Sequence, residues 1–371
     1  MKIAIIGAGS AGLFTAWYLS RLGDGNDITL IDKGEPGRGT TWKAAGMLAP
    51  VHELEFQELE VLRAGLASRD LYFQEVAPSL GEIGLRHHGS LEVALNHDDA
   101  AYLHRQFQFQ QSHGLEVEWL TGGSIQEVEP FVSKNIGHAI WSHKDTQVDN
   151  WALVGRLVAS LRKSSVTLLT QTAVRAWQME GDGKVSLKMN DRTESYDKVL
   201  LAVGVPSQDI QSQLPYRIYP VRGEMVCLET PPGDFPRTQV RIMSKVLGNA
   251  YVVPKMDRIL CGSTSEEKGL EASNTGGGLL NILRKCHAVI PAIDEMKVQE
   301  IWAGLRPSTL NRLPMLIQEP GRPIFHLNGL YRHGILLGPL MGKSAALMLL
   351  GRERLPETQP FGGRTVISNA P

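Results

Sequence analysis

Hydrophobic residues change their spacing twice near the start of the chain. Residues 2–6 form a short apolar run that stops at Gly7, residues 10–21 space their apolar positions as a helix does, and residues 28–31 form a second apolar run. Short apolar runs bounded by turn signals are typical of buried strands. The order of strand, helix and strand therefore predicts one βαβ unit.

The rest of the pattern predicts further helices and short strands. We expect helices over residues 54–77, 99–113, 150–162 and 279–289, and a last helix that ends at residue 350. We expect strands over residues 90–95, 166–174, 198–203, 218–228, 239–243, 251–254, 259–262 and 324–327, and a strand that runs into Trp302. An antiparallel sheet is the simplest arrangement for the short strands between residues 218 and 262.

The turn after the first predicted strand carries a glycine fingerprint. Its sequence is Gly7-Ala8-Gly9-Ser10-Ala11-Gly12, which is G-x-G-x-x-G. The first glycine permits a tight turn, the second lets the backbone approach a pyrophosphate, and the third lets helix and strand pack closely. Asp32, 20 residues after Gly12, ends the second strand, where a carboxylate accepts hydrogen bonds from ribose hydroxyls. The fingerprint predicts a dinucleotide site and leaves NAD and FAD as alternatives.

Composition argues against several classes of binding partner and against a membrane span. The chain has 371 residues, with 38 Lys and Arg against 39 Asp and Glu, so it lacks the basic excess that binds nucleic acids. Its cysteines, Cys227, Cys261 and Cys286, form no C-x-x-C pair, which argues against zinc and disulfides and favours a reducing cytoplasm. The apolar start of the chain is interrupted by glycines and is interpreted as structure rather than as a secretory signal. We expect a cytoplasmic protein with no nucleic-acid partner and no membrane span.

Histidine positions do not predict a metal site. His52, His87, His88 and His333 show neither H-x-x-x-H spacing nor an acid at the spacing of a metal ligand. We therefore expect no bound metal, and we expect these side chains to be structural or on the surface.

Four further segments resemble one protein family. Residues 40–48, 198–204, 302–307 and 331–339 are similar to segments of the glycine oxidase (thiazole-biosynthesis type) branch of the D-amino-acid oxidase family of FAD-dependent oxidoreductases. The likeness runs over nearly the whole chain, and its most specific part is Trp302-Ala303-Gly304-Leu305-Arg306-Pro307. A plain buried strand would by itself explain the pattern of residues 198–204.

The resemblance implies an α/β fold with two domains. An FAD-binding, Rossmann-like domain of the glutathione-reductase type would comprise residues 1–85, 146–218 and 319–371. A second, α+β substrate-binding domain, built on a large antiparallel sheet, would comprise residues 86–145 and 219–318. FAD would be bound noncovalently, since no cysteine lies in the matched flavin-lining segments.

The resemblance also implies which residues contact FAD. Small residues between Thr40 and Leu48 would let the chain pass close to the flavin ring. Val174 would flank the adenine, and a glycine-rich turn before the last helix would face the pyrimidine edge of the flavin. The implied cofactor-binding residues are Gly7, Gly9, Ser10, Ala11, Gly12, Asp32, Lys33, Thr40, Thr41, Ala45, Gly46, Met47, Val174, Ala202, Gly204, Arg306, His333, Gly334, Ile335 and Leu336.

Three side chains are implied for the substrate. Arg306 falls on the family's arginine that binds the substrate carboxylate, a task that suits the planar guanidinium group. Tyr251 aligns with an active-site tyrosine whose hydroxyl could donate a second hydrogen bond, although a tyrosine in a strand is more often a packing residue. Arg332 would support the site electrostatically or shape its lid.

Several positions depart from the family pattern, so the resemblance does not define the substrate. Asn249 stands where close relatives often have histidine, and Ser265 stands where they tend to have methionine. Trp42 and Lys43 replace two small residues near the flavin. A cation at Lys43 could alter the flavin potential or its reaction with oxygen, whereas a solvated lysine is the simpler interpretation.

The implied activity is oxidative deamination of glycine, sarcosine or a D-amino acid. Hydride transfer to flavin N5 would give an imine, and oxygen would be the acceptor, giving hydrogen peroxide, in an enzyme that we expect to be a homo-oligomer. Two other interpretations stay open. One is a dehydrogenase or tailoring enzyme that oxidises a larger secondary amine with another acceptor, and the other is a flavin-binding partner protein with little turnover.

Overall fold

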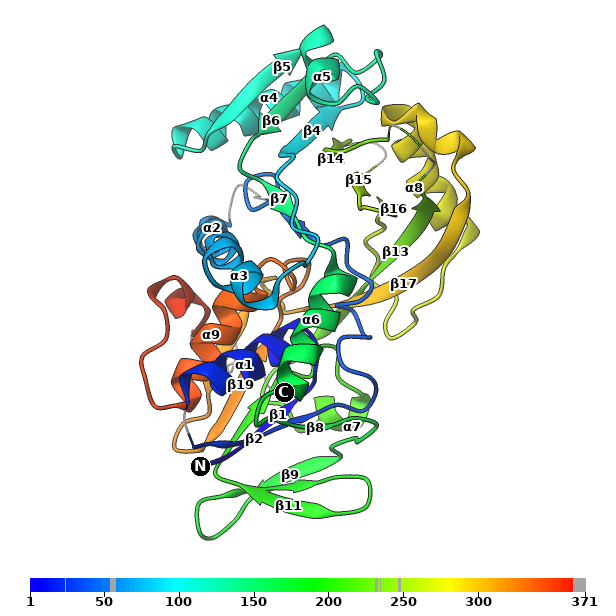
Figure 1. Cartoon of the computed structure of the whole chain (residues 1–371). Coiled ribbons are helices and arrows are strands. Elements are labelled where there is room, and N and C mark those ends of the chain that lie inside the picture. Colours follow the sequence, from blue (N-terminus) through cyan, green and yellow to red (C-terminus); the bar gives the residue numbers. More distant parts are fainter. Residues whose placement is uncertain (24, 54–57, 231–232, 234, 246–247, 363–371) are drawn as a thin grey trace.

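Two large β-sheets organise the chain in the computed structural model (Figure 1). The structure describes residues 1–23, 25–53, 58–230, 233, 235–245 and 248–362. One sheet has six strands and lies in the lower half of Figure 1, and the other has eight strands and lies in the upper half. No helix among the described residues is both long enough and apolar enough to cross a bilayer.

The six-stranded sheet has the order β18-β19-β12-β1-β2-β8. Its strands are β1 (Lys2–Ile6), β2 (Asp27–Ile31), β8 (Thr167–Leu169), β12 (Lys198–Leu201), β18 (Met315–Gln318) and β19 (Ile324–Asn328). All neighbours are parallel except β18, which pairs antiparallel with β19 at one edge. Ile3, Ala4 and Ile5 are fully buried, as expected for a parallel sheet that is covered on both faces.

Helices cover one face of this sheet and a small sheet covers the other. The helical face carries α1 (Ser10–Leu22), α6 (Asn150–Arg162) and α9 (Gly338–Leu349), whose apolar residues share one buried cluster. On the opposite face, Val185, Leu187 and Tyr196 pack against Ala4 and Ile6. They belong to a three-stranded antiparallel sheet of β9 (Ala176–Met179), β10 (Val185–Lys188) and β11 (Thr193–Tyr196).

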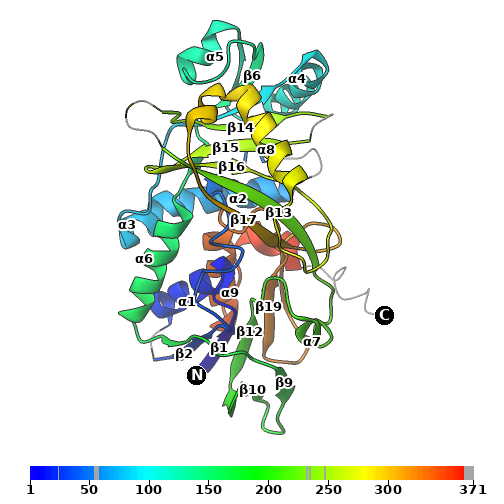
Figure 2. The same ribbon diagram turned by 90° about the vertical axis from the view of Figure 1, so that its right-hand side faces the viewer.

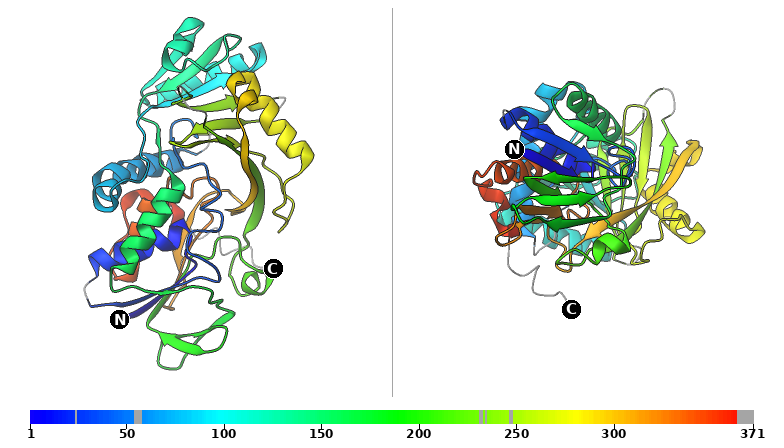
Figure 3. Two further views of the ribbon diagram at one scale, coloured as in Figure 1. Left: turned by 45° about the vertical axis from the view of Figure 1, so that its right-hand side comes forward. Right: turned by 90° about the horizontal axis from the view of Figure 1, so that it is seen from below.

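The eight-stranded sheet has the order β17-β13-β16-β15-β14-β4-β6-β5. Its strands are β4 (Ser90–Ala94), β5 (Val117–Thr121), β6 (His138–Ser142), β13 (Tyr219–Glu229), β14 (Gln239–Met243), β15 (Ala250–Pro254), β16 (Arg258–Gly262) and β17 (Val298–Ser308). Neighbours are antiparallel except β14 and β4. Helix α8 (Gly276–Val289) lies across this sheet in Figure 2, and Figure 3 shows β13 and β17 curving from it toward the six-stranded sheet.

The remaining elements connect or flank these sheets. They are β3 (Met47–Leu48), β7 (Thr146–Gln147), α2 (Leu59–Leu71), α3 (Ala77–Leu80), α4 (His97–Ser112), α5 (Gly123–Val128), α7 (Gln208–Gln211), the π-helical turn η1 (Tyr72–Val76) and the 3₁₀ turns η2 (Pro291–Glu295) and η3 (Pro356–Gly362). Strands β3 and β7 pair with each other.

Most predicted elements are confirmed, with corrections at their ends. Helix α6 and strand β14 have the predicted bounds. The helix predicted over residues 54–77 is replaced by α2, η1 and α3, and its first four residues lie outside the described residues. The strand predicted over residues 166–174 ends at Leu169, because Gln171 adopts a positive φ of 52° that a strand cannot accommodate.

The division of the chain into two domains at the predicted boundaries stays a prediction. Most strands of the predicted FAD-binding domain lie in the six-stranded or three-stranded sheet, and the strands of the predicted substrate-binding domain lie in the eight-stranded sheet. Strand β18 is the exception, since residues 315–318 fall in the predicted substrate-binding domain but pair with β19 of the six-stranded sheet.

Candidate active site

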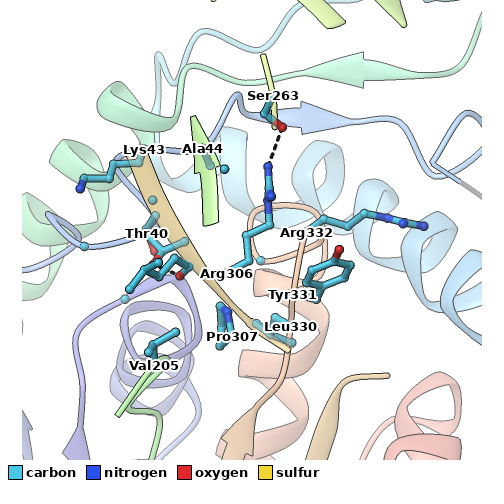
Figure 4. Close-up of a pocket in the computed structure, with 18 of the residues that line it drawn as sticks. Thr40, Lys43, Ala44, Val205, Ser263, Arg306, Pro307, Leu330, Tyr331 and Arg332 are labelled. Carbon is cyan, nitrogen blue, oxygen red and sulfur yellow. Dashed lines mark hydrogen bonds between the residues drawn. The ribbon is translucent and has the colours of Figure 1, made fainter. Parts of the chain in front are cut away.

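A cavity of about 1130 Å³ opens between the two sheets. Its walls come from the carboxyl ends of β1 and β12, from residues 37–47, from residues 330–335 and from one face of the eight-stranded sheet. Figure 4 shows part of this wall, with Arg306 on β17 and Thr40 beside that strand. The cavity therefore joins the predicted dinucleotide site to the predicted substrate side chains.

The glycine-rich loop has the geometry that its sequence predicts. Gly7 has a φ of 101°, and a Cβ atom there would collide with the carbonyl oxygen of Ala202. A Cβ atom at Gly12 would collide with the carbonyl oxygen of Gly7, whereas at Gly9 it would meet only the hydroxyl of Thr41, at 3.4 Å. The backbone at Gly9 is thus open to the cavity beside the N-terminus of α1, which is the environment that a pyrophosphate requires.

Asp32 holds this loop in place and faces the cavity. Its Oδ2 accepts a hydrogen bond from the Ala8 N–H at 2.6 Å, and its Oδ1 accepts one from the Gly34 N–H at 2.8 Å. A carboxylate can accept about four hydrogen bonds. Asp32 therefore keeps acceptor capacity for ribose hydroxyls while it fixes the loop.

The small-residue segment between Thr40 and Met47 is held by aromatic stacking. The Trp42 and Trp151 rings lie 4.9 Å apart with their planes at 6°, and the Arg38 guanidinium lies 3.6 Å from the Trp42 ring centre. The indole N–H of Trp151 also donates to the carbonyl oxygen of Trp42 at 2.8 Å. Contacts within the protein therefore hold this part of the cavity wall.

Lys255 is buried beneath the same segment. Its Nζ donates to the side-chain oxygen of Gln147 at 2.8 Å and to the carbonyl oxygen of Val148 at 2.7 Å. Gly46, with a φ of 74°, passes so close that a Cβ atom there would lie 3.1 Å from Nζ. Burial lowers the pKa of Lys255 to about 7, because the low-dielectric surroundings disfavour its charged form.

Arg306 points into the cavity from β17. Its side chain extends over Gly223, where a Cβ atom would collide with the guanidinium group, and it donates to Ser263 Oγ at 2.5 Å and to the carbonyl oxygen of Thr264 at 3.1 Å (Figure 4). Tyr251 also lines the cavity, and burial raises the pKa of its hydroxyl while the charge of Arg306 opposes that rise. The two side chains implied for carboxylate binding therefore meet on one sheet face.

Arg332 lines the cavity, but its guanidinium has partners in the protein. It donates to Glu58 Oε2 at 2.6 Å and to the carbonyl oxygen of Glu53 at 2.9 Å, and it points away from Arg306 in Figure 4. Its Nε donates to His333 Nε2 at 3.1 Å, which leaves His333 Nδ1 to donate to Glu53 Oε2 at 3.3 Å. Arg332 is thus placed to shape the wall of the cavity.

Most of the predicted cofactor-binding residues line the cavity. Those that do are Gly7, Gly9, Ser10, Ala11, Asp32, Lys33, Thr40, Thr41, Ala45, Gly46, Met47, Ala202, Gly204, Arg306, Gly334 and Ile335. Gly12, Val174, His333 and Leu336 do not line it. Val174 packs in the cluster on the far face of the six-stranded sheet, and the Leu336 carbonyl accepts a hydrogen bond from Ser68.

The positions that depart from the family pattern also lie at the cavity. Asn249 and Ser265 line it and are exposed. Lys43 is half-buried, and its Nζ donates to the carbonyl oxygen of Ala303 at 2.6 Å. The Lys43 side chain stays partly exposed and points away from Arg306 in Figure 4, and its interpretation as a solvated side chain stays a prediction.

Sequence reasoning missed several charged residues of the cavity wall, among them Glu53 and Arg241. Glu53 lines the cavity and is buried against His333. Burial raises the pKa of Glu53, but the hydrogen bond with His333 and the nearby charges together outweigh burial, so that the pKa falls below its usual value. Arg241 alternates with the apolar residues Val240 and Ile242 of a predicted strand. That alternation was a usable signal for Arg241, because it places the arginine on the face opposite to the core.

A glycine-rich loop at a helix N-terminus, open to a cavity whose other wall carries arginine and tyrosine, defines a dinucleotide-binding protein with a separate substrate wall. The described residues fit FAD at this site, since the loop leaves room for a pyrophosphate and Asp32 offers acceptors for ribose.

Comparison with known proteins identifies the family. Residues 2–348 match the family described as FAD dependent oxidoreductase. The chain is 29% identical over 368 residues to a glycine oxidase from Geobacillus kaustophilus, covering 97% of this chain and 95% of that protein. It is 28% identical over 372 residues to a glycine oxidase from Pseudomonas aeruginosa, covering 97% of this chain and 98% of that protein.

A solved structure agrees with these sequence matches. The crystal structure of glycine oxidase from Geobacillus kaustophilus superposes with a TM-score of 0.89 at 28% identity, and the match covers 98% of each chain. The chain belongs to the FAD-dependent oxidoreductase family, and FAD is its cofactor. The predicted family, fold class and cofactor are thereby confirmed.

Proposed function

We propose that the protein catalyses the oxidative deamination of a small amino acid or amine. The observation that carries this proposal is the position of Arg306, whose guanidinium faces the cavity beside Tyr251 and is held by Ser263 and Thr264. Full-length similarity to proteins named glycine oxidase supports the same reaction class. A carboxylate bound at Arg306 would bring the amine-bearing carbon of the substrate toward the space between the two sheets.

In this proposal each side chain has a defined task. Arg306 binds the substrate carboxylate through two parallel hydrogen bonds, Tyr251 assists as a donor, and Arg332 shapes the wall. Bound FAD would supply the acceptor for the hydride that leaves the carbon bearing the amine. The protein contributes orientation rather than a base, because a deprotonated amine needs mainly correct placement for this step.

The residues that would hold FAD are those of the cavity wall between the glycine-rich loop and Ile335. Binding would be noncovalent, since neither cysteine nor histidine lines the cavity in the part of the chain that the structure describes. Val174, His333, Gly12 and Leu336 would act from behind the wall, by packing or through the backbone.

The electron acceptor and the cellular context belong to the same proposal. Oxygen is proposed as the acceptor because the relatives are named oxidases. A cytoplasmic location fits the cysteines Cys227, Cys261 and Cys286, which are all free and buried. A homo-oligomer stays an expectation from the family resemblance.

The test is anaerobic titration of the purified yellow protein with glycine, sarcosine, D-alanine and D-proline. We expect one of these amines to bleach the flavin absorption, and we expect admission of air to restore the colour with release of hydrogen peroxide. Bleaching without peroxide would favour the dehydrogenase alternative. No bleaching by these or by larger secondary amines would leave the flavin-binding partner protein as the explanation.

A further inference from the structure

Arg241 lies on the cavity face of the eight-stranded sheet, one strand away from Tyr251. The register pairs Arg241 of β14 with Tyr251 of β15 on one side and with Glu92 of β4 on the other. Residues directly opposite each other in neighbouring strands project from the same face. Arg241 and Tyr251 both line the cavity. A second guanidinium therefore faces the space that the substrate would occupy.

The protein itself satisfies Arg241 only in part. Its Nε lies 3.5 Å from Glu92 Oε1, and 17% of the arginine side chain is exposed. No residue in the described ranges accepts a hydrogen bond from its two terminal nitrogens. Burial raises the pKa of Glu92 to about 7, an effect that Arg241 opposes, so Glu92 is only partly ionised near neutral pH.

The other charged groups on this wall leave a positive excess. The acids Glu53 and Glu266 line the cavity. Glu53 is held by the hydrogen bond with His333 and by the charges of Arg241 and Arg332, and Glu266 is paired with Arg222 at 3.0 Å. The lining residue Lys285 adds a further cation from α8, and it donates to the carbonyl oxygen of Asn249 at 3.0 Å. An anion that enters beside Arg241 would therefore meet attraction from this wall.

We propose that Arg241 forms a second carboxylate subsite, so that the preferred substrate is an amine bearing two carboxylates. This inference rests on the proposed function, in which Arg306 binds the first carboxylate. Arg306 lies on β17, but its guanidinium reaches Ser263, the residue that directly follows β16. A single strand, β15, separates β16 from β14, and two strand spacings amount to about 10 Å. That separation suits a chain of a few atoms between two carboxylates, as in aspartate, glutamate or iminodiacetate, and glycine is too short to reach both arginines.

The first experiment measures binding without chemistry. Succinate and butyrate have the same number of carbons but two and one carboxylates, and neither carries an amine. Each is titrated into the oxidised holoenzyme while the flavin absorption spectrum is recorded. We expect succinate to bind about tenfold or more tightly than butyrate, because a buried hydrogen-bonded charge adds that much affinity.

Variants test whether Arg241 causes the difference in affinity between succinate and butyrate. Arg241→Gln should weaken succinate about ten- to a hundredfold and change butyrate by less than about twofold. Arg241→Lys should retain part of the preference, since lysine keeps the charge but lacks the forked geometry. Lys245→Gln removes an exposed cation just beyond the same strand and should keep the full preference. Unchanged flavin content and melting temperature would show that each variant is folded.

Two results would overturn the subsite. One is equal binding of succinate and butyrate by the unaltered protein, and the other is equal weakening of both by Arg241→Gln. A second assay separates failure of the subsite from failure of the proposed function. It measures anaerobic bleaching of the flavin by iminodiacetate, D-aspartate, D-glutamate and glycine. Amines that bleach the flavin in a protein without succinate preference would refute the subsite alone. A succinate preference in a protein that no amine bleaches would refute the proposed function and retain the subsite.

Discussion

The guanidinium of Arg306 donates a hydrogen bond to the hydroxyl of Ser263, with 2.5 Å between Nη2 and Oγ. Ser263 follows the last residue of β16, so this bond fixes an arginine of one strand by the end of another. Without the Ser263 hydroxyl, Arg306 would keep its charge but lose one of the hydrogen bonds that orient its guanidinium group.

Ser263→Ala should raise KM for the amine substrate about fivefold and change kcat little. The size corresponds to one net hydrogen bond of about 1 kcal/mol, and the effect falls on KM because Arg306 binds the carboxylate in the ground state as well. Steady-state kinetics under air measure both constants. The matched control is Ser212→Ala, an exposed serine after α7 that does not line the cavity. A fall in kcat at constant KM would contradict the positioning role.

Gly12→Ala should abolish FAD retention. The added methyl group would collide with the carbonyl oxygen of Gly7, so α1 would have to move away from the loop that faces the pyrophosphate. The ratio of absorbance at 450 nm to that at 280 nm after purification reports the flavin content.

The control for this substitution is Gly155→Ala in the exposed middle of α6, where a Cβ atom meets nothing within 4 Å. It should retain FAD and stabilise the protein by up to about 1 kcal/mol, because alanine favours a helix interior more than glycine does. A fully flavinylated Gly12→Ala protein would be incompatible with close packing at the loop.

Trp151→Leu should weaken FAD binding by loosening the segment between Thr40 and Met47. The substitution removes the stack on Trp42 and the indole hydrogen bond to its carbonyl, together a loss of about 2 kcal/mol. Part of this loss should appear as a higher Kd for FAD, measured by quenching of flavin fluorescence when the apoprotein is titrated. The control is Trp177→Leu in β9 of the three-stranded sheet, which should leave the Kd for FAD unchanged. Equal affinities of both variants would exclude a role for the stack.

Lys255 should make the free energy of unfolding depend on pH above neutrality. Its pKa is about 7 when folded, below the value of 10.5 that it has when unfolded. Between these values the unfolded chain binds the extra proton, so stability rises with pH over that window, and below about pH 7 the full cost of the buried charge remains.

Lys255→Met should remove this rise. Denaturant unfolding at pH 7 and pH 10 gives the two free energies, and the difference between the unaltered protein and the variant should change by a few kcal/mol between them. Taking differences cancels the titration of tyrosines and cysteines in the same range. Lys268→Met, at an exposed position, should show no such change, and a Lys255→Met protein with the same pH dependence as the unaltered one would refute the burial argument.

Sequence alone predicts the parts of this molecule whose causes are local. The loop from Gly7 to Gly12 is predictable because its glycine spacing is a local pattern, although Ala202 and Asp32 also contact it. Helix α6 has its predicted bounds because its apolar period is regular and because Asp149 caps it, accepting hydrogen bonds from the N–H groups of Trp151 and Ala152. The position of Arg306 follows from a specific segment that resembles a known family.

Sequence could not predict pairings between distant segments. Glu53 and His333 are 280 positions apart, and Glu58 and Arg332 are 274 positions apart, so no local spacing indicates that they meet. The sequence does not predict the three-stranded sheet, because polar residues in its strands obscure the period of a strand. It does not predict β18, which is mostly apolar but only four residues long. Arg241 is different, because the alternation of polar and apolar residues in its strand indicates that its side chain faces away from the core. Its pairing with Tyr251 on the neighbouring strand cannot be read from the sequence.

Packing between α1 and α9 joins two segments that are far apart in the chain. Gly338 and Gly342 allow α9 to approach Ser10 and Phe14 so closely that a Cβ atom at either glycine would collide with α1, and Ser10 donates to the carbonyl oxygen of Gly334 at 2.5 Å. The apolar side of α1 is therefore covered only when α9 has packed against it. A chain truncated before residue 330 would lack this packing and the cavity wall that residues 330–335 form. We expect such a chain to retain no FAD and to expose an apolar helix face that chaperones bind.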